Sequence, residues 1–199
     1  MLSSRLCLLP AMLLAAASAF AVPVISVDAD PTSSGIQSVV DVQVGTSFSV
    51  DIVISGVEPT PPVQGFQFNL GFDPVVLTAV SAVDGGFLTA PVFDIGDLDN
   101  LLGDVLFASV TLGTAGVSTA GVLATVGFEA SAVGTSLLDL QNVLLSGPSG
   151  QDIPVGQVNG GRVNVLPDQT VAEPQTLLIL ALGLVGLAAF RRRARSQAP

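Results

Sequence analysis

Four aspartates close together in the sequence are the residues whose spacing suggests ligand chemistry. Asp94, Asp97, Asp99 and Asp104 fall within eleven residues. Carboxylates at such spacings can surround a hard cation such as calcium, which takes about six to eight oxygen ligands. The segment lacks the sixth-position glycine and the twelfth-position glutamate of an EF-hand loop. We therefore treat it as a candidate calcium site, with a solvated connecting loop as the alternative interpretation.

The residue types on which most enzymes depend are scarce. The chain has no histidine, tyrosine or tryptophan, its basic residues are all arginines, and its one cysteine is Cys7. The usual general bases and nucleophiles are therefore missing, apart from carboxylates and hydroxyls. A glycosidase pair of Asp94 with Asp99 or Asp104 is conceivable, but acidic residues this numerous pair by chance. We expect a protein without enzymatic activity.

The charge balance limits the partners. Residues 22–172 contain fifteen acidic residues and one basic residue, Arg162, a net charge of −14. Nucleic-acid binding needs clustered lysines and arginines, so a nucleic-acid partner is excluded. Sugar rings commonly stack on exposed tryptophan or tyrosine, and this chain has neither. Any carbohydrate recognition would depend on Asn, Asp and backbone groups.

The elements that must position these residues are predicted to be strands. Residues 48–55, 66–72 and 122–129 alternate apolar and polar side chains, the period of a strand with one face on a core. Phe66, Phe68, Leu70 and Phe72 share one such face and are predicted core residues. Further candidate strands, separated by turn signals, are 24–28, 39–44, 76–80, 105–112, 137–145, 153–155 and 162–165. Without an amphipathic helix, this pattern predicts an all-β, two-sheet sandwich over residues 22–166.

The order of these segments is similar to that of a cohesin domain. The resemblance is carried by residues 44–56, by the run Gly65-Phe-Gln-Phe-Asn-Leu-Gly-Phe-Asp-Pro-Val-Val-Leu77, by residues 121–130 and by the ending 160–165. It implies a jelly roll of about nine strands that docks a calcium-loaded dockerin partner. A sandwich of unrelated ancestry is the alternative. Gln67 and Asn69 lie on the strand face opposite the core, where a partner could bind or where the face is simply solvated.

The start of the chain resembles a signal peptide. Residues 1–21 contain one positive charge, Arg5, then an apolar stretch over 6–17 and the small-x-small pattern formed by Ala19 and Ala21. Signal peptidase cleavage there would leave Val22 as the first residue. Because Cys7 would be removed, the mature protein is expected to contain neither a disulfide nor a thiolate metal site.

The end of the chain has three parts: the motif Ala172-Glu173-Pro174 within a linker over 167–175, an apolar run over 176–190, and a basic tail over 191–199 with Arg191, Arg192, Arg193 and Arg195. As a helix the run would be about 22 Å long, short of a ~30 Å hydrocarbon core. This ending resembles the PEP-CTERM sorting signal, with Ala172 at the position of the first proline. The resemblance implies processing by an exosortase-type membrane protease; an ordinary single-pass anchor is the alternative.

The arginine cluster is expected to stay cytoplasmic and stop the helix in the inner membrane, with the domain on the periplasmic side. We therefore expect an exported, non-enzymatic cohesin-like interaction module, held briefly at the inner membrane and then delivered to the cell surface or extracellular matrix. Its expected partner is a dockerin-like protein or an extracellular polysaccharide, and no cofactor beyond calcium is expected. The alternative function is an exopolysaccharide-associated structural or carbohydrate-binding matrix protein.

Overall fold

The computed structural model describes residues 22–57, 61–113 and 115–168. The expected signal peptide with Ala19 and Ala21, the motif Ala172-Glu173-Pro174, the apolar run and the terminal arginines lie outside these residues. None of the helices within the described part of the chain is long and apolar enough to cross a membrane.

The described residues form an all-β structure, which confirms the predicted fold class, with twelve strands in place of about nine. A single 3-10 turn covers Pro148–Gly150. The strands are β1 (Val24–Asp28), β2 (Val39–Gln43), β3 (Ser47–Ser55), β4 (Gly65–Gly71), β5 (Leu77–Asp84), β6 (Val92–Asp99), β7 (Asp104–Thr111), β8 (Gly121–Ala130), β9 (Gly134–Ser146), β10 (Asp152–Ile153), β11 (Gln157–Asn159) and β12 (Gly161–Leu166).

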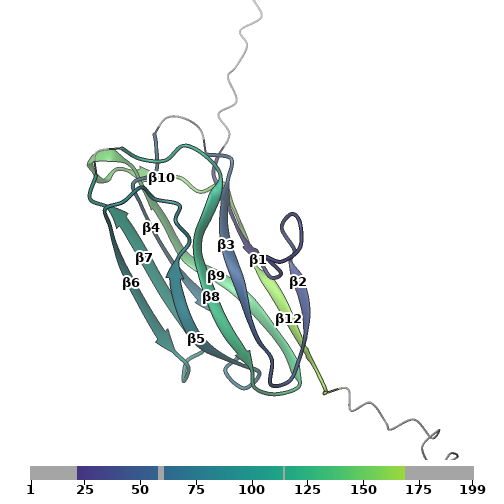
Figure 1. Cartoon of the computed structure of the whole chain (residues 1–199). Helices are drawn as coiled ribbons and strands as arrows, with labels where there is room; N and C mark the ends of the chain where they lie inside the picture. Colours follow the sequence, from purple (N-terminus) through teal and green to yellow (C-terminus); the bar gives the residue numbers. More distant parts are fainter. Residues whose placement is uncertain (1–21, 58–60, 114, 169–199) are drawn as a thin grey trace, which may run out of the picture.

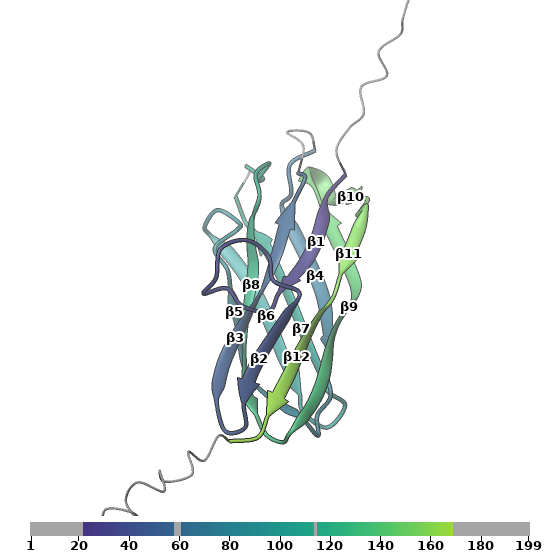
Figure 2. The ribbon, with the colours of Figure 1, turned by 90° about the vertical axis from the view of Figure 1, so that its right-hand side faces the viewer.

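Two sheets pack face to face as a sandwich (Figures 1 and 2). One sheet has the order β11-β1-β3-β8-β5, and the other has the order β2-β12-β9-β4-β7-β6, with β10 added along β9. Most neighbours are antiparallel, while β1 with β11 and β12 with β2 are parallel. The chain changes sheets between β11 and β12, so the edge of β9 is covered by β12 at one end and by β10 at the other.

The core lies between the sheets and follows the alternation seen in the sequence. Phe66, Phe68, Leu70 and Phe72 are all less than a tenth exposed, which confirms their predicted burial. Phe68 stacks on Phe107 of β7 with ring centroids 6.1 Å apart, a separation typical of favourable aromatic pairs. Gln67 and Asn69 are partly exposed on the other side of β4, as a period of two requires.

One end of the sandwich gathers the turns that follow β2, β4, β6 and β8 together with the end of β12 (Figure 1). Hydrogen bonds link the turn after β4 to the turn after β6 (Phe72 N to Gly103 O, 2.8 Å) and the turn after β2 to the end of β12 (Val44 N to Leu166 O, 2.9 Å). We call this end the tail pole, because the chain leaves the described structure there. Strand β1 begins at the opposite pole (Figure 2).

Candidate functional site

The four aspartates of the candidate calcium site are not brought together. The segment expected to be a loop is mostly strand β6, paired along its whole length with β7. Alternation along β6 places Asp97 and Asp99 on the outer side of the sheet and Asp94 on the side facing the other sheet. No group of three or more potential metal ligands converges within the part of the chain that the structure describes. The four carboxylates therefore do not form one cluster: Asp94 faces the other sheet, whereas Asp97, Asp99 and Asp104 lie on the outer side.

Asp94 instead lies near Asp84 of β5, in the other sheet. Burial raises the pKa of Asp84 above its usual value, the backbone N–H of Gly86 partly opposes this, and the negative charge of Asp94 raises the pKa further. One carboxylate oxygen of Asp84 is buried without a hydrogen-bond partner, whereas the other accepts from Gly86 N at 3.1 Å. This pair of like charges destabilises the ionised form of Asp84.

The remaining three aspartates belong to the outward side of strands β9, β4, β7 and β6, which we call the outer face. Its side chains form lateral rows set by the strand pairing. From β6 to β9, the four rows are Phe93-Val110-Gly65-Ser146, Ile95-Ala108-Gln67-Leu144, Asp97-Leu106-Asn69-Gln141 and Asp99-Asp104-Gly71-Asp139. Neighbours within a row are close enough for their side chains to touch the same ligand.

The outer face is apolar at one end. Phe93 is 57% exposed, Ile95 51%, Val110 40% and Leu144 57%, and they come from three strands. Monomeric soluble proteins usually scatter exposed apolar side chains singly. Phe93, Ile95 and Val110 adjoin one another on β6 and β7, whereas Ala108 and Gln67 lie between Ile95 and Leu144. Exposed apolar side chains gathered on one face of a sheet are typical of a surface that another macromolecule covers.

The other end of the outer face is polar and acidic. The Asn69 side chain donates to Asp104 Oδ2 at 2.6 Å and accepts from the Asn142 side chain at 3.3 Å. Gln141 donates to Asp139 Oδ2 at 2.8 Å. These bonds hold carboxylates and amides in fixed positions on the surface, so this end offers hydrogen-bond acceptors for a partner rich in donors.

A rigid turn closes the β6–β7 hairpin beside this acidic end. Asp99 Oδ1 accepts the backbone N–H groups of Leu101 and Leu102, both at 2.9 Å. The side-chain amide of Asn100 bonds to both backbone groups of Ala79 in β5, accepting from its N–H at 2.7 Å and donating to its carbonyl at 2.9 Å. The turn is thus tied to both sheets, yet Leu101 and Leu102 are 92% and 79% exposed.

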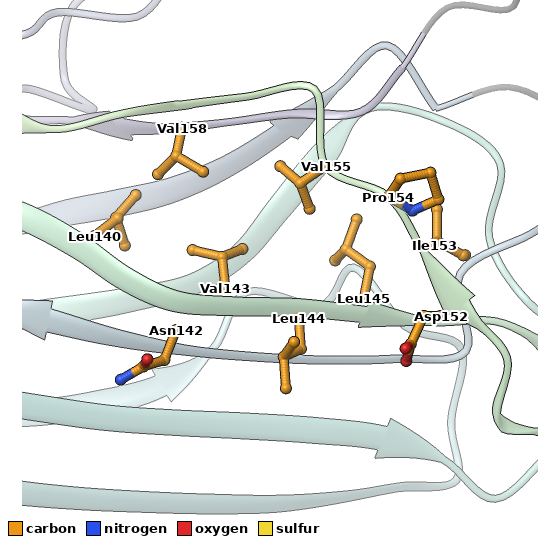
Figure 3. Close-up of a pocket in the computed structure, with 10 residues that line it drawn as sticks. All are labelled: Leu140, Asn142, Val143, Leu144, Leu145, Asp152, Ile153, Pro154, Val155 and Val158. Carbon is orange, nitrogen blue, oxygen red and sulfur yellow. The ribbon is translucent and has the colours of Figure 1, made fainter.

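A pocket of about 430 Å³ lies beside β9, next to the apolar end of the outer face. It opens where β9 bulges at Asn142, whose φ is +49°, along the stretch of β9 that lies between its pairing with β12 and its pairing with β10. Figure 3 shows Val143 and Leu145 pointing toward Val155, whereas Leu144 points away from them. The full lining is Leu140, Asn142, Val143, Leu144, Leu145, Asp152, Ile153, Pro154, Val155 and Val158.

The sequence pattern alone does not single out the exposed apolar residues of the outer face or of the turn. Phe93 and Ile95 alternate within a segment whose aspartates dominated the interpretation. Their alternation was a signal for a strand, but the same face also carries Asp97 and Asp99, so it did not look like a core face. Leu101 and Leu102 carry no periodic signal, because they belong to a turn.

Comparison with known proteins agrees with this architecture. Residues 33–165 match the model of the cohesin domain family, and residues 170–193, which lie outside the described structure, match the PEP-CTERM protein-sorting motif. Both matches confirm the resemblances found in the sequence. No curated protein is significantly similar in sequence to the chain. A PEP-CTERM signal marks an exported protein that is held transiently at a membrane.

Solved cohesin structures share the fold. A non-cellulosomal cohesin from the archaeon Archaeoglobus fulgidus superimposes with a TM-score of 0.58 at 17% identity, covering 75% of this chain and 94% of that one. The cohesin of a type I cohesin–dockerin complex from Clostridium thermocellum gives a TM-score of 0.61 at 14% identity, covering 74% and 95%. A cohesin module of a family 33 glycoside hydrolase from Clostridium perfringens gives 0.60 at 14% identity, covering 74% and 99%.

Cohesin domains are non-catalytic protein-interaction modules, which agrees with the expected absence of enzymatic activity. The family model spans two thirds of the sequence, from residue 33 in the loop before β2 to residue 165 in the last strand. The chain therefore belongs to the cohesin domain family.

Proposed function

We propose that this exported cohesin domain docks a dockerin-like protein through its outer face. The observation that carries the proposal is the arrangement of that face, where an apolar end lies directly beside an end rich in carboxylates and amides. Apolar side chains would supply most of the affinity, and the fixed polar groups would set the orientation of the partner. The solved cohesin from Clostridium thermocellum is in complex with a dockerin, which supports the class of partner.

The outward side of the five-stranded sheet is a poorer docking surface. It carries small and hydroxyl-bearing side chains such as Ser49, Ser81 and Thr125, and Thr125 donates to Asp51 of the next strand at 2.7 Å. Its exposed apolar residues include Val80 and Val83 on the edge strand β5, each 52% exposed. This pair is matched in exposure to Phe93 and Ile95, so it provides a control on the opposite sheet.

Binding should be measured for three forms of the domain: unchanged, Phe93→Ser with Ile95→Ser, and Val80→Ser with Val83→Ser. Immobilised calcium-loaded dockerin modules are the first bait, and immobilised exopolysaccharide is the second. Losing two large apolar contacts from an interface should cost more than about 1.4 kcal/mol, so the outer-face variant should bind dockerin at least about tenfold more weakly. The control should bind normally. Equal binding by both variants would refute the location, and capture by polysaccharide alone would favour the matrix-protein alternative.

We further propose that the tail places the domain on the periplasmic side of the inner membrane until an exosortase-type protease cuts near Ala172-Glu173-Pro174, after which the domain reaches the cell surface or the extracellular matrix. The order of motif, short apolar run and arginines supports this route. Mass spectrometry of the mature protein should find a chain that starts at Val22 and lacks Arg191–Arg193. An intact tail on protein at the cell surface would contradict the proposed cleavage.

A further inference from the structure

Exposed apolar side chains concentrate at the tail pole. Among the described residues, the four most exposed large apolar side chains are Leu101 (92%), Leu102 (79%), Val75 (73%) and Leu112 (68%). The first three lie in turns at the tail pole, together with Val133, which is 57% exposed. The outer face, defined by its strands, does not include these turn residues.

The turns that present these side chains are held rigidly. Asp99 accepts the N–H groups of both leucines, and Asp73 Oδ1 accepts the N–H of Val75 at 2.9 Å. Gly103 closes the leucine turn at φ +70°, where an added Cβ would overlap the carbonyl oxygen of Phe72. A flexible loop could fold its leucines against the domain, but these bonds keep them directed into the surroundings. The pole is therefore preorganised to contact something apolar.

The direction of the chain identifies the occupant. The described structure ends at Asp168 on this pole, and only residues 169–175 separate it from the apolar run at 176–190. Seven residues span at most about 25 Å when fully extended. Once the run is inserted in the inner membrane, the tail pole is thus confined close to the lipid surface. A tethered contact needs little intrinsic affinity, because the tether raises the effective concentration of the surface.

We propose that the tail pole is a membrane contact, in which Leu101, Leu102, Val75 and Val133 enter the headgroup region while the tail holds the chain. This inference rests on the proposed membrane insertion of the tail. Apolar groups of interfacial proteins lie about 5–10 Å into the boundary between headgroups and acyl chains. The contact holds the domain upright, with its long axis pointing away from the membrane surface. The outer face, which is a lateral face of the sandwich, therefore stays open to a partner.

The charges at this pole favour contact with lipids that carry no net charge. Carboxylates surround the apolar group, and Arg162, the second residue of β12, is the one basic residue among the described residues. Carboxylates close to the pole include Asp73, Asp99, Asp104, Glu129, Asp139 and Asp168. Anionic lipids would repel these groups, so the contact should be strongest on zwitterionic bilayers, unlike a contact made through basic residues.

The test uses the chain from Val22 to Pro199 inserted into phosphatidylcholine vesicles. Because this chain has no cysteine, Leu102→Cys can carry a single environment-sensitive fluorophore. Leu112→Cys is the matched control, since Leu112 is also a largely exposed leucine, at 68% against 79% for Leu102, and lies at the opposite pole. Lipids with a quencher in the acyl chain should remove most of the fluorescence at position 102 and little at position 112. Adding anionic lipid should restore part of the signal at position 102.

Two controls separate the possible failures. If alkaline washing releases the protein from the vesicles, the membrane insertion of the tail is wrong, and the inference falls with it. If the protein stays inserted but both labels escape lipid quenching, the tail is confirmed and the membrane contact is refuted. A label at position 102 that is shielded from an aqueous quencher without being quenched by lipid is covered by protein, which also refutes the contact.

Discussion

Replacing Asn100 by alanine is the sharpest test of the structure that holds the β6–β7 turn. The Asn100 amide accepts from Ala79 N at 2.7 Å and donates to Ala79 O at 2.9 Å. It thereby makes the two backbone hydrogen bonds that a neighbouring strand would otherwise make, next to the bulge in β5. Ala79 is 3% exposed, so its peptide groups would lose their partner in a place that water does not easily reach.

Each buried polar group left without a partner costs about 1–3 kcal/mol, so the loss of both bonds should lower the free energy of unfolding by about 2–6 kcal/mol. For a domain of this size each kcal/mol shifts the melting temperature by about 2–4 °C, which gives a fall of about 4–24 °C. Urea unfolding followed by circular dichroism measures the first quantity, and a thermal scan measures the second.

Asn164→Ala is the control, because it also removes two bonds of an asparagine amide, but exposed ones to side chains: Asn164 Nδ2 to Asp41 Oδ1 at 2.7 Å and Thr135 Oγ1 to Asn164 Oδ1 at 3.2 Å. Surface substitutions of this type stay within about 0.5 kcal/mol. Asn100→Asp should destabilise as well, because a carboxylate can accept from Ala79 N but cannot donate to Ala79 O. A cost below about 1 kcal/mol for Asn100→Ala would refute the reasoning, since the Ala79 peptide groups would then be satisfied in another way.

Three further predictions follow from the core and from the aspartates. Phe68→Ala should cost about 3–5 kcal/mol in urea unfolding, because the ring is fully buried; a cost below about 1 kcal/mol would place it outside the core. Asp84→Asn should raise the melting temperature at pH 7. A carboxyl whose pKa is raised on folding destabilises the folded state as the pH rises above 3.8, the pKa in the unfolded chain, so the gain from the substitution should vanish below pH 3.8. Millimolar calcium should leave the melting temperature unchanged, because Asp94 lies apart from Asp97 and Asp99; a rise that Asp97→Asn with Asp99→Asn abolishes would re-establish a site there.

The central strands were predictable because each has one fully buried face. In β4 that face is Phe66, Phe68 and Leu70, and the period of two is clear in the sequence. Strand β6 was missed because it is an edge strand with no fully buried residue: Phe93 and Ile95 share their exposed face with two aspartates. Strand β11 has only three residues, too few to show any period.

The outer face was beyond sequence reasoning for a different reason. Ile95, Gln67 and Leu144 come from strands far apart in the chain and become neighbours only through the order β6-β7-β4-β9. A period of two indicates which residues point outward, but it does not indicate which strands lie side by side. The bulge that opens the pocket beside β9 also depends on this pairing, since it marks a shift in register between β4 and β9.

The aspartates that suggested a metal site also have a physical role in the strand they occupy. Among the strands that the structure describes, β6 pairs only with β7, so its other edge offers unpaired backbone groups to any other strand. Its exposed Phe93 and Ile95 would strengthen such pairing between two copies. Asp94, Asp97 and Asp99 put charge on both faces of that edge, and a second copy would bring the same charges against them. The strand can therefore expose apolar side chains to a partner of different charge while it resists association with itself.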